Sequence, residues 1–420
     1  MKKLLCIIMS LVAVASSALS FLSYAVATDI DEISADEFAK EISSMLNVTA
    51  MTEGAFGSEY GTGSDEFSTG RLIVKSKYKI DTMNAVSVVC GYDDLWVLQF
   101  DNPDDARNAY NVYLSDSKIE YTEIDKEVYA LFSDATLSEG MSYSGEEEHT
   151  YLSWGPEYIG IDKLNRNISI SNTETFDTVV AVIDTGVDHE HPYLKDRVLP
   201  TKINTSTSGT RNNSMDDNGH GTQVAGVIID STMDNVFVQP YKVLDSHGAG
   251  TVISLAAGIN CAVEDGVDVI NISVGFEEDS AVLKSAVDNA ELNDIPVISA
   301  SGNDGTTKKY YPASYDNVLK VTAVNQSGIV TNFSTYDNGV SFAAPGFEIR
   351  TTNLGGGFIK TRGTSVAAPF VTAVVAAVYS YRPNALSEEI YEIICNTCVQ
   401  ISEHNSAIKY GLYISTQQTI

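Results

Sequence analysis

The sequence predicts an α/β domain around a mainly parallel sheet, preceded by a smaller α+β unit. From residue 178 onwards, short β-branched runs alternate with helical stretches, which is the pattern of a parallel sheet. The runs are apolar on both faces, as expected of strands that are covered on both sides. These predicted strands are 178–183, 236–244, 267–272, 295–299 and 318–324, and the predicted helices include 251–265, 279–292 and 365–381.

The composition is that of an acidic globular protein. The chain has 420 residues, of which 44% are hydrophobic and 20% charged. At roughly 150 residues per domain, this length allows two or three domains. The 26 basic and 56 acidic residues give a formal net charge of −30. Such a chain repels phosphate backbones and anionic membrane surfaces, so the sequence argues against nucleic-acid binding.

Residues 1–27 are expected to be a secretory signal peptide. Lys2 and Lys3 supply a positive start, residues 4–15 are almost wholly apolar, and Ala25-Val26-Ala27 is a small-x-small cleavage site. The alternative is an uncleaved membrane anchor. No later apolar run is expected to reach the length of about 18 to 20 residues that a spanning helix needs, so no stable membrane span is predicted. The mature chain should then be secreted.

Residues 28–150 are more acidic than the remainder. They carry 26 acidic and 8 basic residues, whereas residues 151–420 carry 30 and 16. Strands are expected at 71–74, 85–90, 95–100 and 119–128, and a helix from the Asn102 cap through residue 114. Residues 28–131 therefore form a small α+β unit. Residues 132–152 have no periodicity and are expected to be an exposed linker, after which the α/β domain spans 153–420.

A first motif places an acid at the end of a strand. Asp184 follows the apolar run 178–183 and precedes the turn Thr185-Gly186. Open α/β sheets place functional groups at the carboxyl ends of their strands. A turn-forming aspartate is the alternative.

A second motif places a histidine at the start of a helix. His220 lies between Gly219 and Gly221, which allow other backbone to approach closely, and small or apolar residues follow. A neutral histidine at a helix N-terminus can serve as a general base. A purely structural histidine is the alternative.

A third motif places a serine at the start of a helix. Ser365, within residues 363–369, opens the apolar stretch that continues to residue 381. The free amides and the dipole at a helix N-terminus suit an oxyanion. The alternative is that Ser365 only caps the helix.

Together the three motifs bring an acid, a base and a nucleophile in the order Asp, His, Ser. The lipase-type elbow G-x-S-x-G is absent, because Ala367 stands where its second glycine would be. On all three motifs, residues 153–420 resemble the subtilisin-like serine proteases (peptidase S8). The acidic unit before them is similar to the inhibitory pro-domain that such proteases carry.

The resemblance implies a three-layer subtilisin-like domain and a role for each motif. Ser365 would be the nucleophile, His220 the general base and then acid, and Asp184 the group that orients the imidazole. Asn303, in the segment 299–305, would donate to the oxyanion beside the Ser365 amide. An ordinary Asn-Asp-Gly turn is the alternative for Asn303.

The resemblance also implies where a substrate lies. An extended peptide would pair with two backbone segments of the enzyme, 248–250 and 273–275, and its first side-chain pocket would lie between 273–275 and 300–303. The expected substrate-binding residues are Gly248, Ala249, Gly250, Ser273, Val274, Gly275, Ala300, Ser301 and Gly302.

Several positions depart from the family pattern or bear on metals. Tyr193 takes the place of an acid that ligates calcium, and the stretch 228–242 is too short for the usual calcium loop. Phe276 stands where a second glycine is common. The resemblance also implies a cis bond at Tyr311-Pro312, and cis bonds are mainly confined to X-Pro. Neither the cluster at 188–191 nor the cysteines suggest a metal site, so no metal and no cofactor are expected.

The sequence thus predicts a secreted serine endopeptidase that acts on proteins or peptides and is made as a self-processing zymogen. Its own pro-domain would be its inhibitor, and its first cut would fall between residues 130 and 152. A specialised processing protease for one secreted peptide is an alternative. A non-catalytic binding protein with the same fold is a further one.

Overall fold

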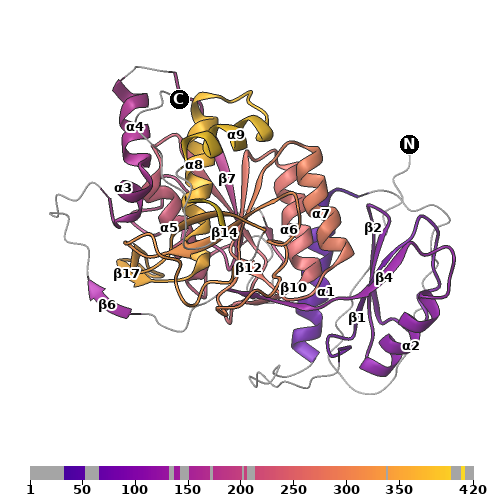
Figure 1. Cartoon of the computed structure of the whole chain (residues 1–420). Coiled ribbons are helices and arrows are strands. Elements are labelled where there is room, and N and C mark those ends of the chain that lie inside the picture. Colours follow the sequence, from indigo (N-terminus) through magenta and orange to yellow (C-terminus); the bar gives the residue numbers. More distant parts are fainter. Residues whose placement is uncertain are drawn as a thin grey trace.

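The computed structural model describes residues 33–52, 66–131, 137–141, 151–170, 174–200, 203–205, 213–336, 339–398 and 408–411. The expected signal peptide lies outside these ranges. Of the expected linker, only residues 137–141 and 151–152 are described. Figure 1 shows a large α/β body with the smaller N-terminal unit packed beside it.

The α/β body is built on an eight-stranded sheet in the order β18-β15-β14-β13-β11-β7-β9-β8, and every adjacent pair is parallel. Its strands are β7 (Thr178–Asp184), β8 (Ile203–Asn204), β9 (Val236–Lys242), β11 (Val269–Ile272), β13 (Val297–Ala300), β14 (Val318–Val324), β15 (Val340–Pro345) and β18 (Ile408–Gly411). All five predicted strands are confirmed, with ends that differ by a few residues. β8, β15 and β18 were not predicted from the sequence.

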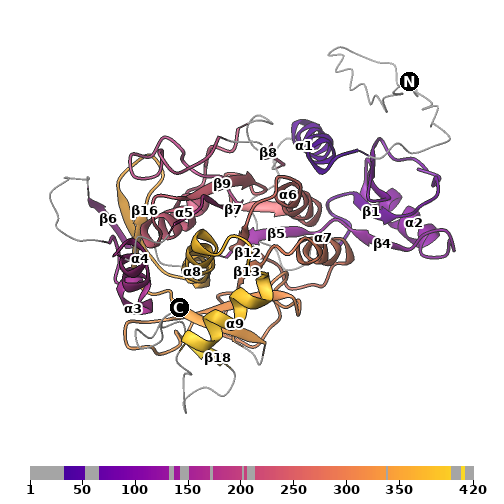
Figure 2. The same ribbon diagram turned by 90° about the horizontal axis from the view of Figure 1, so that it is seen from above.

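Helices cover both faces of this sheet and complete the three layers that the resemblance implied (Figure 2). One face is covered by α5 (His220–Ser231) and α8 (Ala368–Tyr381), and the other by α6 (Val252–Glu264) and α7 (Ala281–Leu292). Further helices are α3 (Gly155–Ile159), α4 (Ile161–Ile170) and α9 (Ser387–Thr397), of which α9 packs on α8. The starts of α6 and α7 follow from their sequences, because the Thr251 and Ser280 hydroxyls accept hydrogen bonds from Ser254 N and Leu283 N.

The central helix corrects one expectation. Among the described residues, Thr364–Tyr381 is long and apolar enough to cross a membrane, so the prediction that no later run reaches that length was wrong. However, 94% of this segment is buried inside the protein. A helix covered on all sides by other elements has to be apolar all round, which explains the composition.

The order in which the chain passes through the strands gives the carboxyl end of β7 a special place in the sheet. From β7 the chain passes through α5 to β9, and then crosses back through α6 to β11 on the other side of β7. The direction of winding therefore reverses at β7. In open α/β sheets, the crevice for ligands lies at the carboxyl ends of the strands at such a reversal. Asp184 is the last residue of β7.

The N-terminal unit contains a four-stranded antiparallel sheet in the order β2-β3-β1-β4. Its strands are β1 (Arg71–Lys75), β2 (Ser87–Tyr92), β3 (Leu95–Gln99) and β4 (Tyr121–Ile124). Helix α2 (Pro103–Tyr113) packs on β1 and β4 and starts as predicted, since Asn102 Oδ1 accepts a hydrogen bond of 2.9 Å from Asp105 N. The predicted strand 119–128 is instead two strands, because β5 (Glu127–Ala130) leaves this sheet and pairs with the α/β body.

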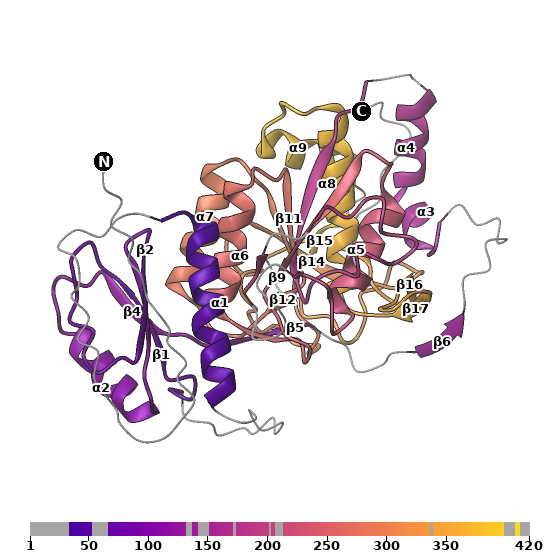
Figure 3. The ribbon, with the colours of Figure 1, turned by 180° about the vertical axis from the view of Figure 1, so that it is seen from behind.

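The sequence analysis missed a helix at the start of this unit. Helix α1 (Ala35–Thr52) lies between β2 and α6, and Figure 3 shows it beside α6. Its buried residues Phe38, Ile42 and Met45 belong to the same apolar cluster as residues of α6 and α7. The N-terminal unit and the α/β body therefore share a continuous core.

Candidate active site

Asp184 and His220 form a buried pair. His220 is the first residue of α5, and its Nδ1 lies 2.7 Å from Asp184 Oδ1. The same oxygen accepts a 2.7 Å hydrogen bond from Thr185 N. Asp184 is fully buried and His220 is 3% exposed. A carboxylate acceptor at Nδ1 holds the proton on that nitrogen and makes Nε2 the basic one.

The glycines around His220 have the role that the sequence indicated. A β-carbon on Gly221 would lie 2.0 Å from the Gly186 carbonyl oxygen, so only glycine lets α5 begin this close to the turn after β7. Gly219 has a φ of +111°, which L side chains rarely adopt. Both features bring His220 to Asp184.

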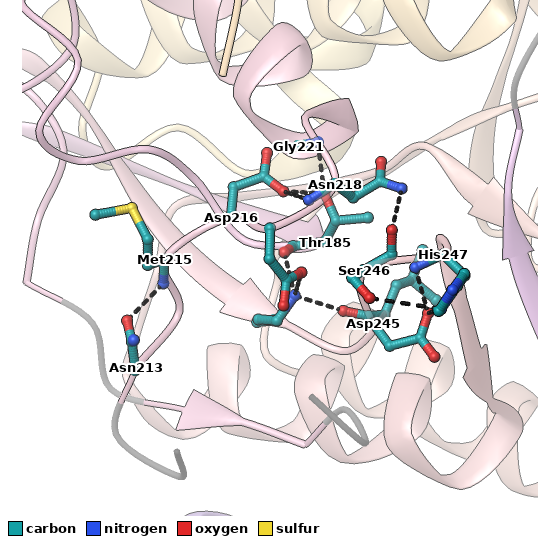
Figure 4. A network of polar contacts seen from close by, with 12 residues as sticks. Thr185, Asn213, Met215, Asp216, Asn218, Gly221, Asp245, Ser246 and His247 are labelled. Carbon is teal, nitrogen blue, oxygen red and sulfur yellow. Dashed lines mark hydrogen bonds and ion pairs between the residues drawn. The ribbon is translucent and has the colours of Figure 1, made fainter. Parts of the chain in front are cut away.

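Asp216 organises the loop that leads into His220. Its two carboxylate oxygens accept hydrogen bonds from the Thr185 and Thr222 hydroxyls and from the amides of Asn218, Gly219 and Thr222. Burial raises the pKa of this carboxyl, and these hydrogen bonds lower it. Figure 4 shows Asp216 beside Thr185, the neighbour of Asp184. The sequence alone did not indicate that this loop supports the Asp–His pair.

The same loop reaches the neighbouring turn. Asn218 Nδ2 donates a 3.0 Å hydrogen bond to the Ser246 carbonyl oxygen (Figure 4). This turn leads through Gly248 into β10 (Ala249–Thr251). The loop before His220 is therefore tied to one of the two segments expected to bind substrate.

Ser365 lies in a short 3₁₀ turn, η1 (Thr364–Val366), directly before α8. The Ser273 hydroxyl donates to the Ser365 carbonyl oxygen at 2.9 Å. Asn303 is oriented by Thr364, whose amide and hydroxyl both donate to Asn303 Oδ1, at 2.8 and 3.0 Å. The amide nitrogen of Asn303 is thus turned away from Thr364.

Leu131, from the N-terminal unit, lies at this site. Its carbonyl oxygen accepts a 2.6 Å hydrogen bond from Asn303 Nδ2. A β-carbon built on Gly363 would be 3.0 Å from Ser365 Oγ, 3.3 Å from Asn303 Nδ2 and 3.7 Å from the Leu131 oxygen. The Ser365 hydroxyl, the Asn303 amide nitrogen and the Leu131 carbonyl oxygen therefore all lie close to Gly363.

The residues before Leu131 form a strand between two segments of the α/β body. β5 pairs antiparallel with β10 on one side and with β12 (Val274–Gly275) on the other. Ala130 N donates to the Gly248 carbonyl at 2.8 Å, and Leu131 N donates to the Ser273 carbonyl at 3.3 Å. Both segments expected from the sequence, 248–250 and 273–275, thus hold one extended peptide.

Residues 300–302, which were expected to bind substrate, directly precede Asn303 and contact other parts of the α/β body. Ser301 Oγ donates to the Thr335 carbonyl at 2.7 Å, and the Gly302 carbonyl accepts from Thr335 N. Ala300 ends β13 and is 1% exposed. A β-carbon on Gly275 would be 3.7 Å from Leu131 Cδ1, so Gly275 lies close to this side chain, and Ala300 belongs to the same apolar cluster as Leu131.

Two carboxylates of the N-terminal unit cap helices of the α/β body. Glu123 accepts from Ser280 Oγ and from the amides of Ala281 and Val282 at the start of α7. Asp125 accepts from Ile253 N at the start of α6. Burial raises the pKa of Glu123, and the three hydrogen bonds lower it. Anionic groups at two helix N-termini stabilise the docked unit.

The positions that depart from the family pattern are also defined. The Tyr193 hydroxyl donates to Asp230 Oδ1 at 2.9 Å. Phe276 exchanges main-chain hydrogen bonds with Tyr311, and the Tyr311-Pro312 bond is cis, as predicted. In the described part of the chain, no three His, Cys, Asp or Glu side chains are grouped in a way that could hold a metal ion.

A doubly wound α/β domain with an Asp–His pair at the winding reversal and a serine at a helix start defines a subtilisin-like class of protein. Residues 176–412 match the model of the subtilase family, peptidase S8. The chain therefore belongs to the subtilase family.

Several curated relatives resemble this domain. The chain is 35% identical over 241 residues to the thermophilic serine proteinase of Bacillus sp. (strain AK1), which covers 55% of this chain and 59% of that protein. It is 34% identical over 246 residues to the cell wall-associated protease of Bacillus subtilis (strain 168), covering 56% of this chain and 27% of that protein. It is 34% identical over 234 residues to subtilisin Savinase of Lederbergia lenta, covering 54% and 85%. The matched part thus spans less than two thirds of the first two relatives.

Proposed function

We propose that the chain is a serine endopeptidase, secreted as a self-processing zymogen, and that its first cut falls between Leu131 and Phe132. The observation that carries this proposal is the Leu131 carbonyl, which accepts from Asn303 beside the Ser365 hydroxyl. The name of the Bacillus sp. (strain AK1) relative, a serine proteinase, supports the same reaction class.

The proposed chemistry gives each of these groups one role. Ser365 Oγ attacks the Leu131 carbonyl carbon while His220 Nε2 takes its proton, and Asp184 stabilises the imidazolium. Asn303 Nδ2 donates to the oxyanion that forms. His220 then gives the proton to the amide nitrogen of Phe132, which leaves as an amine. Water, deprotonated by His220, releases the new carboxyl end at Leu131 from the acyl-enzyme.

Residues 28–131 would remain after this cut as a bound inhibitor. β5 fills the strand position between β10 and β12 that a substrate would need. The Glu123 and Asp125 caps and the core shared through α1 hold the unit in place. Full activity therefore requires removal of this unit, which is the role of a zymogen's pro-domain.

The chain's own segment indicates a cleavage preference. Leu131 would occupy the first pocket, with Ala130, Tyr129 and Val128 before it. Because the contacts of β5 are mainly main-chain pairs, many extended sequences can bind, and Leu at the first position is the best-defined side chain. A broad protease with this preference fits better than an enzyme for a single peptide.

Expression of the full chain and of a Ser365→Ala variant tests the proposal. The wild type should yield two fragments, the larger beginning at Phe132, and should react with a fluorophosphonate probe. The variant should stay intact and unlabelled. If purified Ser365→Ala were cut at the same bond without other proteases, self-processing would be excluded. An uncut, unlabelled wild type would favour a binding protein. Secretion is tested by N-terminal analysis of the exported chain.

A further inference from the structure

A second strand-pairing site lies downstream of Leu131. β6 (Leu137–Met141) pairs antiparallel with β17 (Phe358–Thr361), which pairs with β16 (Ile349–Thr352) on its other edge. Met141 is opposite Phe358 and Leu137 is opposite Lys360, with a register shift between them. Figures 1 and 3 both show β6 beside this hairpin.

One continuous chain therefore pairs with the α/β body on both sides of the Leu131–Phe132 bond. Upstream, β5 lies between β10 and β12. Downstream, Leu137 and Met141 are the sixth and tenth residues after Leu131. Main-chain pairing accepts any sequence that can be extended, so an edge strand used in this way is a peptide-binding site.

The hairpin is fixed to the helix that carries His220. The buried Thr351 and Thr352 hydroxyls donate to the Gln223 and Thr222 carbonyls of α5, each at 2.7 Å. A β-carbon on Gly226 would lie 2.2 and 2.4 Å from these two hydroxyl oxygens, so the approach of the hairpin to α5 requires a glycine. The edge of β17 is thus held in a fixed relation to the catalytic helix.

Two side chains outside the hairpin also hold the turn between β16 and β17 in place. Gly355 N donates to Asp188 Oδ2 at 2.9 Å, and His191 Nε2 is 2.8 Å from the Gly357 carbonyl oxygen. Asp188 and His191, two members of the cluster at 188–191, therefore fix this turn. A strand edge that is fixed at its turn end loses little conformational freedom there when it binds a peptide.

The charge of the hairpin indicates which peptides it favours. Arg350 and Lys360 are direct cross-strand partners, so two positive charges lie on one face of the hairpin. Arg350 interacts electrostatically with Asp230 of α5, whereas Lys360 lies opposite Leu137 of the paired strand, so Lys360 is the positive charge next to the bound segment. The paired segment 137–141 contains one glutamate, Glu139, and no basic residue, and three further glutamates follow at 146–148.

We infer that the edge of β17 is a downstream substrate-binding site. It pairs with the main chain of residues six to ten after the cleaved bond and favours acidic segments there. Its first occupant is the chain's own Leu137–Met141, during self-processing. The inference rests on the proposed function, because the positions are counted from the Leu131–Phe132 bond. Binding at a distance from the reacting group holds that bond against Ser365.

The first experiment measures self-processing of the full chain. Proline has no N–H to donate, so a Leu137→Pro/Met141→Pro variant loses main-chain pairing with β17. Its rate of cutting at Leu131–Phe132 should fall roughly tenfold, as expected for the loss of one or two hydrogen bonds. The control is Ser144→Pro, which adds a proline outside β6 and should be cut at the wild-type rate.

The second experiment uses peptides and the processed Leu137→Pro/Met141→Pro enzyme after removal of the pro-unit. This variant is chosen because a wild-type β6 remains tethered and competes for the edge at high effective concentration. Peptides that contain the sequence of residues 128–132 and extend five or ten residues past the scissile bond are compared. The longer peptide should have a several-fold higher kcat/KM. N-methylation across positions six to ten should abolish the gain, and exchange of its acidic residues for lysine should reduce it.

The outcomes separate the two proposals. A double-proline variant that is cut at the rate of Ser144→Pro, or a kcat/KM that is independent of length, overturns this inference alone. A wild-type chain that stays uncut overturns the proposed function and this inference with it. A gain that survives N-methylation would show that main-chain pairing with β17 is not the cause.

Discussion

Asp230 is a buried carboxyl whose protonation should be visible in the stability of the protein. It lies in α5 and accepts hydrogen bonds from Leu152 N at 2.8 Å and from the Tyr193 hydroxyl at 2.9 Å. Burial raises the pKa of this carboxyl to about 6 from its ordinary 3.8, although these hydrogen bonds lower it. Asp230 thus ties the first residues of the α/β domain to the core.

The size and direction of the effect follow from these values. A pKa of about 6 in the folded chain against 3.8 in the unfolded chain corresponds to about 3 kcal/mol. Between the two values the folded chain keeps its proton and the unfolded chain releases it, so the free energy of unfolding falls as pH rises from about 4 to 6. Above pH 6 it stays lower, because folding then buries a charged group.

The assay is urea unfolding of the uncut Ser365→Ala chain, with and without Asp230→Asn, from pH 4 to 7.5. Asparagine keeps an acceptor oxygen for Leu152 N and Tyr193 but never ionises. The free energy of unfolding of the chain that retains Asp230 should fall relative to that of the Asp230→Asn chain by up to about 3 kcal/mol across this range. Other titrating groups are common to both chains and cancel. A difference that is independent of pH, or that rises with pH, would refute the reasoning.

Three further predictions concern the site and the N-terminal unit. Asn303→Ala should lower kcat by roughly two to three decades with a smaller change in KM, a magnitude measured in a related subtilisin. If the variant and the wild type had equal kcat values, Asn303 would not be a donor to the oxyanion. Phe38→Ala removes a buried ring that stacks on Tyr92 and belongs to the apolar cluster shared with α6 and α7, so it should weaken the binding of the processed N-terminal unit, measured as its dissociation rate, whereas exposed Glu37→Ala should not. A chelator should leave the melting temperature of the mature form nearly unchanged, because the Tyr193 hydroxyl donates to Asp230 where the family pattern has a calcium-binding acid; a large drop would reveal a cation site.

Local sequence patterns were sufficient for most of the regular elements. The five apolar runs became strands of the parallel sheet, because a strand buried on both faces must be apolar throughout. The caps at Asn102, Thr251 and Ser280 start their helices because each interaction spans only three residues. Helix α1 was not predicted, although Phe38, Ile42 and Met45 recur at helical spacing and therefore indicate a helix.

Elements whose partners are distant could not be found in this way. β18 is short and pairs with β15 at the edge of the described sheet. Residues 119–128 have the pattern of one strand, although the structure divides them between two sheets. Asp216 is a comparable case at the site. Nothing in its sequence neighbourhood distinguishes it from a solvated turn residue. Its importance follows from burial and from the Thr185 and Thr222 hydroxyls that donate to it.

The sequence by itself determined the chemical groups and their order: an acid after a strand, a histidine between glycines, and a serine at a helix start. These are local features, set by spacing along a few residues. Only the tertiary structure decided that the Leu131 carbonyl, in the expected range 130–152, lies at Asn303 and Ser365. That choice depends on the pairing of β5 with strands more than a hundred residues away, which are brought together by folding of the whole chain.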